Sequence, residues 1–209
     1  MAGKVFFSVS MSLDGFIAPE SLSELMGRQW VELQAWILPQ RFFRENLKFG
    51  AGGEEGRDND IVRETFERTG ASVMGRRMFD EGEVGWPDPP PFGAPVFVLT
   101  HHGREPWVRQ GGTTFTFVTD GIESVLEQAR DAADRKDVRV AGGAKVVQQF
   151  VRAGLVDEWQ IHLAPVLLGA GVRLFDHTDP KHVELESTRM IESPRVTHLR
   201  YRFVKEKTE

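Results

Sequence analysis

The chain has 209 residues, of which 40% are apolar, and its formal net charge is -5 at pH 7. This acidic balance argues against a general nucleic-acid binder, because a bound anion would need a local basic pocket. The absence of cysteine excludes disulfides, thiolate metal sites and cysteine nucleophiles. No apolar run approaches the roughly 20 residues of a membrane span, and the N-terminus carries no secretory pattern, so we expect a cytoplasmic protein.

Residues 4–10 are mostly apolar and β-rich, which predicts a strand covered on both faces. The segment SLDGFIA follows at residues 12–18, and its Asp14-Gly15 pair is a turn signal. It is either a plain turn or a loop at the end of a central strand, where α/β sheets place their ligands.

The residue pattern of the segment 19–57 predicts its structure less clearly than any other part of the chain. Two groups of apolar residues have helical spacing: Leu22, Leu25 and Met26, then Trp30, Leu33, Trp36 and Ile37. With the glycine-rich end at 50–56, this insertion could be a lid over a pocket, a dimer contact or ordinary packing. We favour packing for Phe42 and Phe43, and we leave the roles of Trp30 and Trp36 open.

A first strand–glycine–helix junction is expected after a helix over residues 58–69. That helix has Asp58, Asn59 or Asp60 as its cap and Gly70 as its end. The strand 71–74 then runs into Gly75, Arg76 and Arg77. Arginine suits a planar grip on phosphate, and the helix dipole makes a first-turn cation unfavourable without another reason.

The next strand, residues 96–99, follows a loop rich in proline and glycine at 80–95. It ends in Thr100 and His101, which we interpret as a polar rim. His101 and His102 lack a third metal ligand at a sensible spacing, so we expect no metal site. A strand over 113–118 and a helix over 121–133, capped by Thr119-Asp120, should follow.

The most informative stretch is residues 138–151, a short strand, Gly142-Gly143, and an amphipathic helix. A glycine turn lets a ligand approach the backbone closely, and the positive end of the helix then favours phosphate. The turn could equally only redirect the chain.

The C-terminal part is expected to complete the sheet. We predict a long strand over residues 156–166. We also predict that residues 182–190 and 195–204 form an antiparallel pair at one edge of the sheet. Between them, the loop holding Gly169 and Gly171 is either a turn between core strands or a source of backbone donors beside a ligand.

Five motifs stand in an order that resembles the dihydrofolate reductase-like superfamily. They are SLDGFIA at 12–18, MGRRMF at 74–79, VFVLTH at 96–101, VAGG at 140–143 and PVLLGAG at 165–171. The chain is most similar to the branch that includes the reductase domain of the riboflavin-biosynthesis deaminase/reductase. The resemblance covers nearly the whole chain except residues 19–57.

The resemblance implies one α/β domain over residues 1–209, with a central, mixed but mostly parallel sheet between helical layers and the insertion at about 19–57. It implies NADPH across the strand ends. The matching cofactor positions are Gly75, Arg76, Arg77, Thr100, His101, Gly142, Gly143, Ala144 and Lys145. The double glycine does not fit the Rossmann pattern.

The resemblance also implies hydride transfer from NADPH to a small pteridine- or pyrimidine-type heterocycle, by a homodimer. Asp14 and Asp60 are the matching candidate catalytic carboxylates, and for Glu64 we favour a solvated role. Trp36, Gly169 and Gly171 are candidate pocket residues. A non-catalytic nucleotide-binding or interaction protein on the same fold is the alternative, and glycines that only turn the chain are a third possibility.

Overall fold

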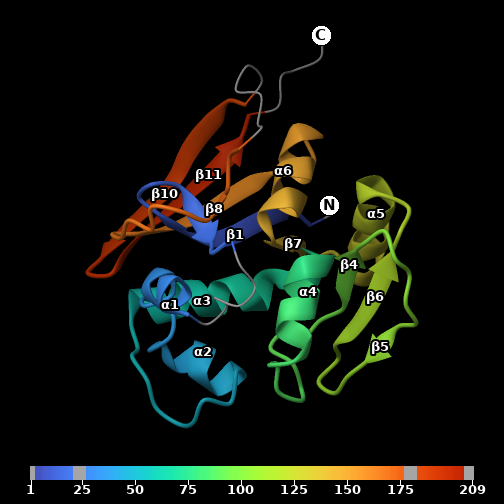
Figure 1. The fold of residues 1–209 in the computed structure, drawn as a ribbon, viewed down its shortest axis with the longest axis horizontal. Helices are drawn as coiled ribbons and strands as arrows, with labels where there is room; N and C mark the ends of the chain where they lie inside the picture. Colours follow the sequence, from blue (N-terminus) through green and yellow to red (C-terminus); the bar gives the residue numbers. More distant parts are fainter. Residues whose placement is uncertain (1–2, 21–26, 177–182, 205–209) are drawn as a thin grey trace.

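We describe a computed structural model for residues 3–20, 27–176 and 183–204. A nine-stranded sheet runs through the molecule in the order β10-β11-β8-β1-β7-β3-β4-β6-β5 (Figure 1). Its parallel strands are β1 Val5–Ser12, β3 Thr69–Gly75, β4 Val96–Leu99, β6 Thr114–Val118, β7 Asp137–Gly142 and β8 Glu158–Ala164. The antiparallel strands are β5 Trp107–Val108, β10 Leu185–Ser193 and β11 Val196–Phe203.

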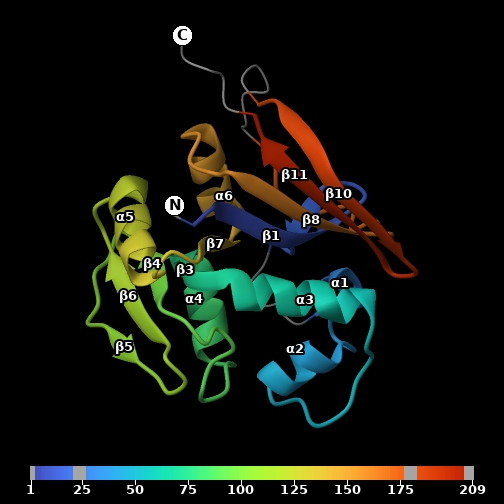
Figure 2. The ribbon, with the colours of Figure 1, turned by 180° about the vertical axis from the view of Figure 1, so that it is seen from behind.

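Helices lie on both faces of this sheet (Figures 1 and 2). They are α1 Arg28–Leu33, α2 Arg41–Asn46, α3 Arg57–Arg68, α4 Arg76–Glu83, α5 Ile122–Ala132 and α6 Ala144–Arg152. A second, two-stranded sheet pairs β2 Phe16–Ala18 with β9 Val172–Arg173. The mixed sheet and the C-terminal antiparallel pair confirm the predicted fold class.

One face of the sheet carries the main apolar core. Alternate residues of the central strands, such as Phe7, Val73 and Val140, pack there against Leu126 of α5 and Phe150 of α6. Because side chains alternate between faces along a strand, these positions send their neighbours to the opposite face. The residues that fill this core therefore determine which of their neighbours along each strand point to the opposite face, toward α3 and α4.

The opposite face divides into an apolar and a polar half. Beneath α4, the Phe79 ring packs on Phe115 at a centroid distance of 5.3 Å. Beneath α3, the strands present buried polar side chains instead, including Gln160, His162 and His198. Such groups are stable in a core only where they find hydrogen-bond partners.

The helix ends differ from the predicted caps. Gly56 and Gly121 are the N-caps of α3 and α5, with positive φ angles, and no side chain caps either helix among the described residues. The predicted cap Asp58 instead faces β11, where it contacts His198. Gly70 lies within β3 rather than ending α3, because the helix passes directly into the strand at Thr69.

The insertion contributes α1 and α2 and packs against the polar half of the sheet. Phe42 lies 5.6 Å from the Phe66 ring, as the packing interpretation expected. Trp36 is 2% exposed and donates its indole N–H to Ser10 Oγ at 2.9 Å. The helical turn expected around Leu22, Leu25 and Met26 lies outside the described residues.

Candidate functional site

The carboxyl ends of the parallel strands meet at one edge of the sheet and gather most of the candidate residues. Met74 is paired with Gly142, and Gly75 with Leu99, so the ends of β7, β3 and β4 are adjacent. Neighbouring strands in a sheet lie about 4.8 Å apart. Segments distant in sequence are therefore brought within reach of one elongated ligand.

The two strand–glycine–helix junctions are in direct contact. A methyl group added at Gly75 would lie 2.9 Å from Val146 Cγ2 of α6 and 3.8 Å from the Gly143 nitrogen. By contrast, a methyl group added at Gly143 would meet nothing within 4 Å. The backbone at Gly143 thus faces open space, where a ligand could approach closely.

The N-terminus of α6 opens onto this space. Gly143 is its N-cap and provides no side-chain cap, so the first-turn N–H groups at Ala144 and Lys145 have no partner inside the helix. Such groups, together with the helix dipole, form a binding site for phosphate. The residues present therefore fit the pyrophosphate of a dinucleotide.

The paired arginines at the start of α4 have different partners. Arg76 donates to Asp80 at 2.7 Å, and its side chain remains 37% exposed. Arg77 donates to Glu81 at 2.7 Å and to the carbonyl oxygens of Pro19 and Glu20 at 3.3 and 3.1 Å. Arg77 is 45% exposed, so the two arginines differ in their partners rather than in exposure: Arg77 also holds the segment after β2, which leaves Arg76 with fewer bonds to give up for a phosphate.

The end of β4 forms the next part of this edge. Thr100 is buried, and its hydroxyl accepts the His102 N–H at 3.1 Å, which turns the chain away from the sheet. His101 is exposed beside it. A polar surface therefore follows the end of β4, whose last residue, Leu99, pairs with Gly75 just before Arg76.

Asp14 and Gly169 are brought together at the other end of this edge, beside β1 and β8. One Asp14 oxygen accepts the Leu168 N–H at 3.2 Å and the other accepts the Gly169 N–H at 2.7 Å. The Ser12 hydroxyl donates to the same carboxylate at 2.6 Å. The Ser12 bond, with those from the two amides, lowers the pKa of Asp14 to about 2, although partial burial opposes the shift.

Asp60 and Trp36 do not join this group. Asp60 is exposed in the first turn of α3. Trp36 is buried in a cluster with Val62 of α3 and Val196 of β11, with its ring 4.5 Å from that of His162 and 4.9 Å from that of His198. At 2% exposure, Trp36 does not line an open surface in this structure.

The two histidines belong to a buried chain of hydrogen bonds that the sequence reading missed. His162 Nε2 lies 2.9 Å from Ser8 Oγ, the Nδ1 atoms of His162 and His198 lie 2.7 Å apart, and His198 Nε2 lies 3.1 Å from Asp58. Burial keeps the pKa of His162 well below 6.5, and neighbouring positive groups act in the same direction. Polar residues at every second position of β1 and β8 were the available signal.

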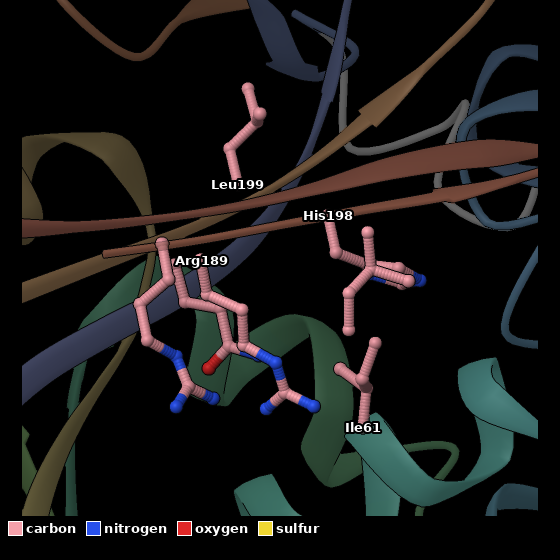
Figure 3. Close-up of a pocket in the computed structure, with 7 residues that line it drawn as sticks. Ile61, Arg189, His198 and Leu199 are labelled. Atoms are coloured by element: carbon pink, nitrogen blue, oxygen red, sulfur yellow. The ribbon is translucent and has the colours of Figure 1, made fainter. Parts of the chain in front are cut away.

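A small cavity of about 10 Å³ adjoins this chain, between α3 and the β8-β11-β10 part of the sheet. Ile61, Arg189 and His198 are among the residues that line it (Figure 3). It lies apart from the strand ends that carry the candidate cofactor residues.

Among the described residues, no group of three or more His, Asp or Glu could hold a metal ion, and no helix is long and apolar enough to cross a membrane.

The architecture is that of the dihydrofolate reductase-like fold. The family model of the RibD C-terminal domain matches residues 3–199, and the chain belongs to that family. It is 24% identical over 190 residues to the Bacillus subtilis protein YwjB, covering 90% of this chain and 92% of YwjB.

Two solved structures share the fold. A candidate riboflavin biosynthesis protein from Shewanella sp. PV-4 matches with a TM-score of 0.66 and 22% identity, covering 97% of this chain and 99% of that one. Dihydrofolate reductase from Enterococcus faecalis, complexed with NADP(H) and RAB-propyl, matches with a TM-score of 0.56 and 13% identity over 98% and 99% of the chains.

Proposed function

We propose that the protein is an NADPH-dependent reductase that transfers hydride to a small heterocyclic substrate. The observation that carries this proposal is the contact between the two glycine junctions, in which Gly75, the residue before Arg76, meets the open N-terminus of α6. Membership of the RibD C-terminal domain family supports it. In such an enzyme the nicotinamide supplies the hydride, and the protein positions and polarises the reactants.

The contacts of α3 favour a pyrimidine-type substrate over a pteridine. Dihydrofolate reductases hold the pterin with a carboxylate on the corresponding helix. Here Asp58 contacts His198, and Glu64 accepts hydrogen bonds from Arg189 and Arg200 at 2.7 and 2.6 Å. Asp14, the other acid considered for this role, is likewise engaged by Ser12, Leu168 and Gly169, and Asp60 is exposed in the first turn of α3.

A titration with NADPH and, in parallel, NADH tests the cofactor site through energy transfer from tryptophan to nicotinamide. We expect micromolar binding of NADPH, clearly tighter than that of NADH. Arg76→Ala should weaken NADPH binding about tenfold, since a hydrogen bond to a charged group contributes roughly 1.5–3 kcal/mol. Arg130→Ala on α5, on the opposite face, is the matched control and should bind as the wild type does.

Turnover is tested separately by following NADPH oxidation with dihydrofolate and with a ribosylamino-pyrimidine. Oxidation with the pyrimidine and not with the folate is the expected result. NADPH binding without oxidation in the presence of either compound would favour the non-catalytic alternative. Failure of the wild-type protein to bind either dinucleotide would contradict the reductase proposal.

A further inference from the structure

The bonds around Asp14 join two loops that are far apart in the sequence. The turn after β1 contributes the Asp14 carboxylate, and the loop after β8 contributes the amides of Leu168 and Gly169. The backbone adds a bond from the Leu13 N–H to the Val166 carbonyl at 3.0 Å. The carboxylate thus fixes the position of the β8–β9 loop relative to the end of β1.

Two glutamine side chains hold the β8–β9 loop and the strand that follows it. Gln29 of α1 donates to the Leu168 carbonyl at 3.1 Å. Gln148 of α6 is buried and donates to the carbonyls of Arg173 and Leu174, both at 3.1 Å. Gln29 thus binds the loop itself, and Gln148 ties β9 and the residue after it to the helix whose N-terminus faces the open space at Gly143.

The order of the strands assigns this loop to one end of the proposed cofactor site. Arg76 and Thr100 lie at the ends of β3 and β4, and the α6 N-terminus follows β7, whose next neighbour is β1. If the pyrophosphate bound at α6 and the phosphorylated adenosine half near Arg76, the nicotinamide half would lie toward β1 and Asp14.

Asp14 is poorly suited to proton transfer in this position. Both of its oxygens already accept hydrogen bonds, from Ser12, Leu168 and Gly169. Its pKa of about 2, caused mainly by the Ser12 hydrogen bond and further by the two amides, keeps the carboxylate ionised at neutral pH. A general acid would need a pKa nearer the working pH.

We propose that Asp14 is a positioning residue that holds the β8–β9 loop in place at the nicotinamide end of the cofactor site, rather than a proton donor. This inference rests on the proposed NADPH-binding function and assigns Asp14 a role within it. The adenosine half depends on α4 and β4, and the nicotinamide half depends on the loop that Asp14 secures.

The test compares NADPH with adenosine 2′,5′-bisphosphate, which carries only the adenosine half of the cofactor. Asp14→Ala should weaken NADPH binding about tenfold, because a charged acceptor of several hydrogen bonds is removed. Its affinity for the bisphosphate should stay within about twofold of the wild-type value. Arg76→Ala should weaken both ligands, and Asp131→Ala on α5 should change neither.

Asp14→Asn retains one acceptor oxygen and nearly the same shape, so it should bind NADPH with an affinity between those of the wild type and Asp14→Ala. Hydrogen exchange at the amides of Leu168 and Gly169 should accelerate in Asp14→Ala and partly in Asp14→Asn. Faster exchange confined to these two amides would show a local effect on the loop, because a general loss of stability would accelerate exchange throughout the protein.

Two results would overturn the inference. One is wild-type NADPH affinity in Asp14→Ala, and the other is an equal loss of NADPH and bisphosphate binding in that variant. If the wild-type protein bound neither NADPH nor the bisphosphate, the proposed reductase function itself would be contradicted. That result concerns the wild type and is therefore distinguishable from the two results for Asp14→Ala.

Discussion

Two glycines near the site have opposite constraints. Gly171 has a φ of +141°, and a methyl group there would lie 2.5 Å from the Ala18 carbonyl oxygen. Gly143 has a φ of -73° and open space where its side chain would be. The first glycine is required by the packing of the protein itself, and the second is required only if a ligand approaches.

We predict that Gly171→Ala destabilises the fold and that Gly143→Ala mainly impairs binding. Strained backbone of this kind costs about 1–3 kcal/mol, which corresponds to a fall in Tm of roughly 5 °C for Gly171→Ala. Gly143→Ala should weaken NADPH binding about tenfold with a Tm change within about 2 °C. Thermal denaturation and NADPH titration of both variants provide the measurements. Unchanged NADPH affinity in Gly143→Ala would place the cofactor elsewhere.

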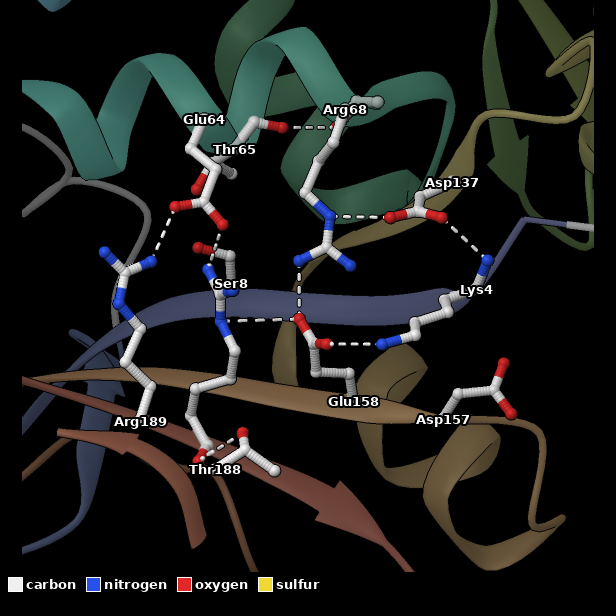
Figure 4. A network of polar contacts seen from close by, with 12 residues as sticks. Lys4, Ser8, Glu64, Thr65, Arg68, Asp137, Asp157, Glu158, Thr188 and Arg189 are labelled. Atoms are coloured by element: carbon white, nitrogen blue, oxygen red, sulfur yellow. Dashed lines mark hydrogen bonds and ion pairs between the residues drawn. The ribbon is translucent and has the colours of Figure 1, made fainter.

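At the scale of elements, a network of charges joins α3 to β8 and β11. Arg68 lies at its centre, paired with Glu158 at 2.5 Å and Asp137 at 2.6 Å (Figure 4). The Arg68 guanidinium also lies 4.1 Å from the centre of the Phe6 ring. Burial opposes ionisation of Glu158, and the ion pair with Arg68 nevertheless holds its pKa below 4.5. The network fixes the position of α3 over a sheet face that lacks a continuous apolar surface.

Removal of Arg68 should therefore destabilise the protein far more than removal of an exposed arginine. Arg68→Ala leaves Glu158 partly buried without its main partner, and we expect a loss of about 3 kcal/mol in the free energy of unfolding. Arg202, paired with Glu186 on the exposed hairpin, is the control, and Arg202→Ala should cost less than about 1 kcal/mol. Urea unfolding measures both, and equal effects would show that the network contributes little.

At the scale of the whole molecule, the buried histidines couple stability to pH. His162 is 4% exposed, and it is surrounded by His198, Ser8 and Trp36, with Arg139 and Arg200 as the nearby charges. Because burial lowers its pKa below 6.5, the folded state holds it neutral where the unfolded chain takes up a proton. The pKa of His198 is also lowered by burial, and Asp58 opposes that shift.

The sign of the pH dependence follows from these shifts. The pKa of His162 is lower in the folded protein than in the unfolded chain, so keeping this histidine neutral stabilises the folded protein above pH 6.5. This contribution to stability is lost as the pH falls from 6.5 toward the pKa of His162 in the folded protein. Between pH 6.5 and 5, the free energy of unfolding should fall by about 1.4 kcal/mol per pH unit for each proton taken up. His162→Gln should show a smaller slope in urea unfolding over this range. An unchanged slope would assign the proton uptake to other groups.

Local patterns predicted the parallel strands well. β4 Val96–Leu99 was placed at its observed bounds, and the strand–glycine–helix junctions at Gly75 and Gly143 were found from short-range sequence alone. Caps were less predictable. Asp58 is a residue type that commonly caps helices, but it contacts His198 instead. His198 lies on a strand about 140 residues later in the chain, so local sequence rules cannot predict this contact.

The sequence by itself determined the longer strands and helices from residue 58 onward, the positions of the glycine turns and the resemblance to one superfamily, because these depend on residues close together in the chain. It did not predict the short strands β2, β5 and β9 or the helix α2. Only the tertiary structure decided which side chains share a site. It showed that Arg76 and Arg77 turn to different partners, that Trp36 lies inside the molecule, and that Asp14 binds the loop at Gly169. Such pairings join residues that only the folded sheet brings together, so no local pattern encodes them.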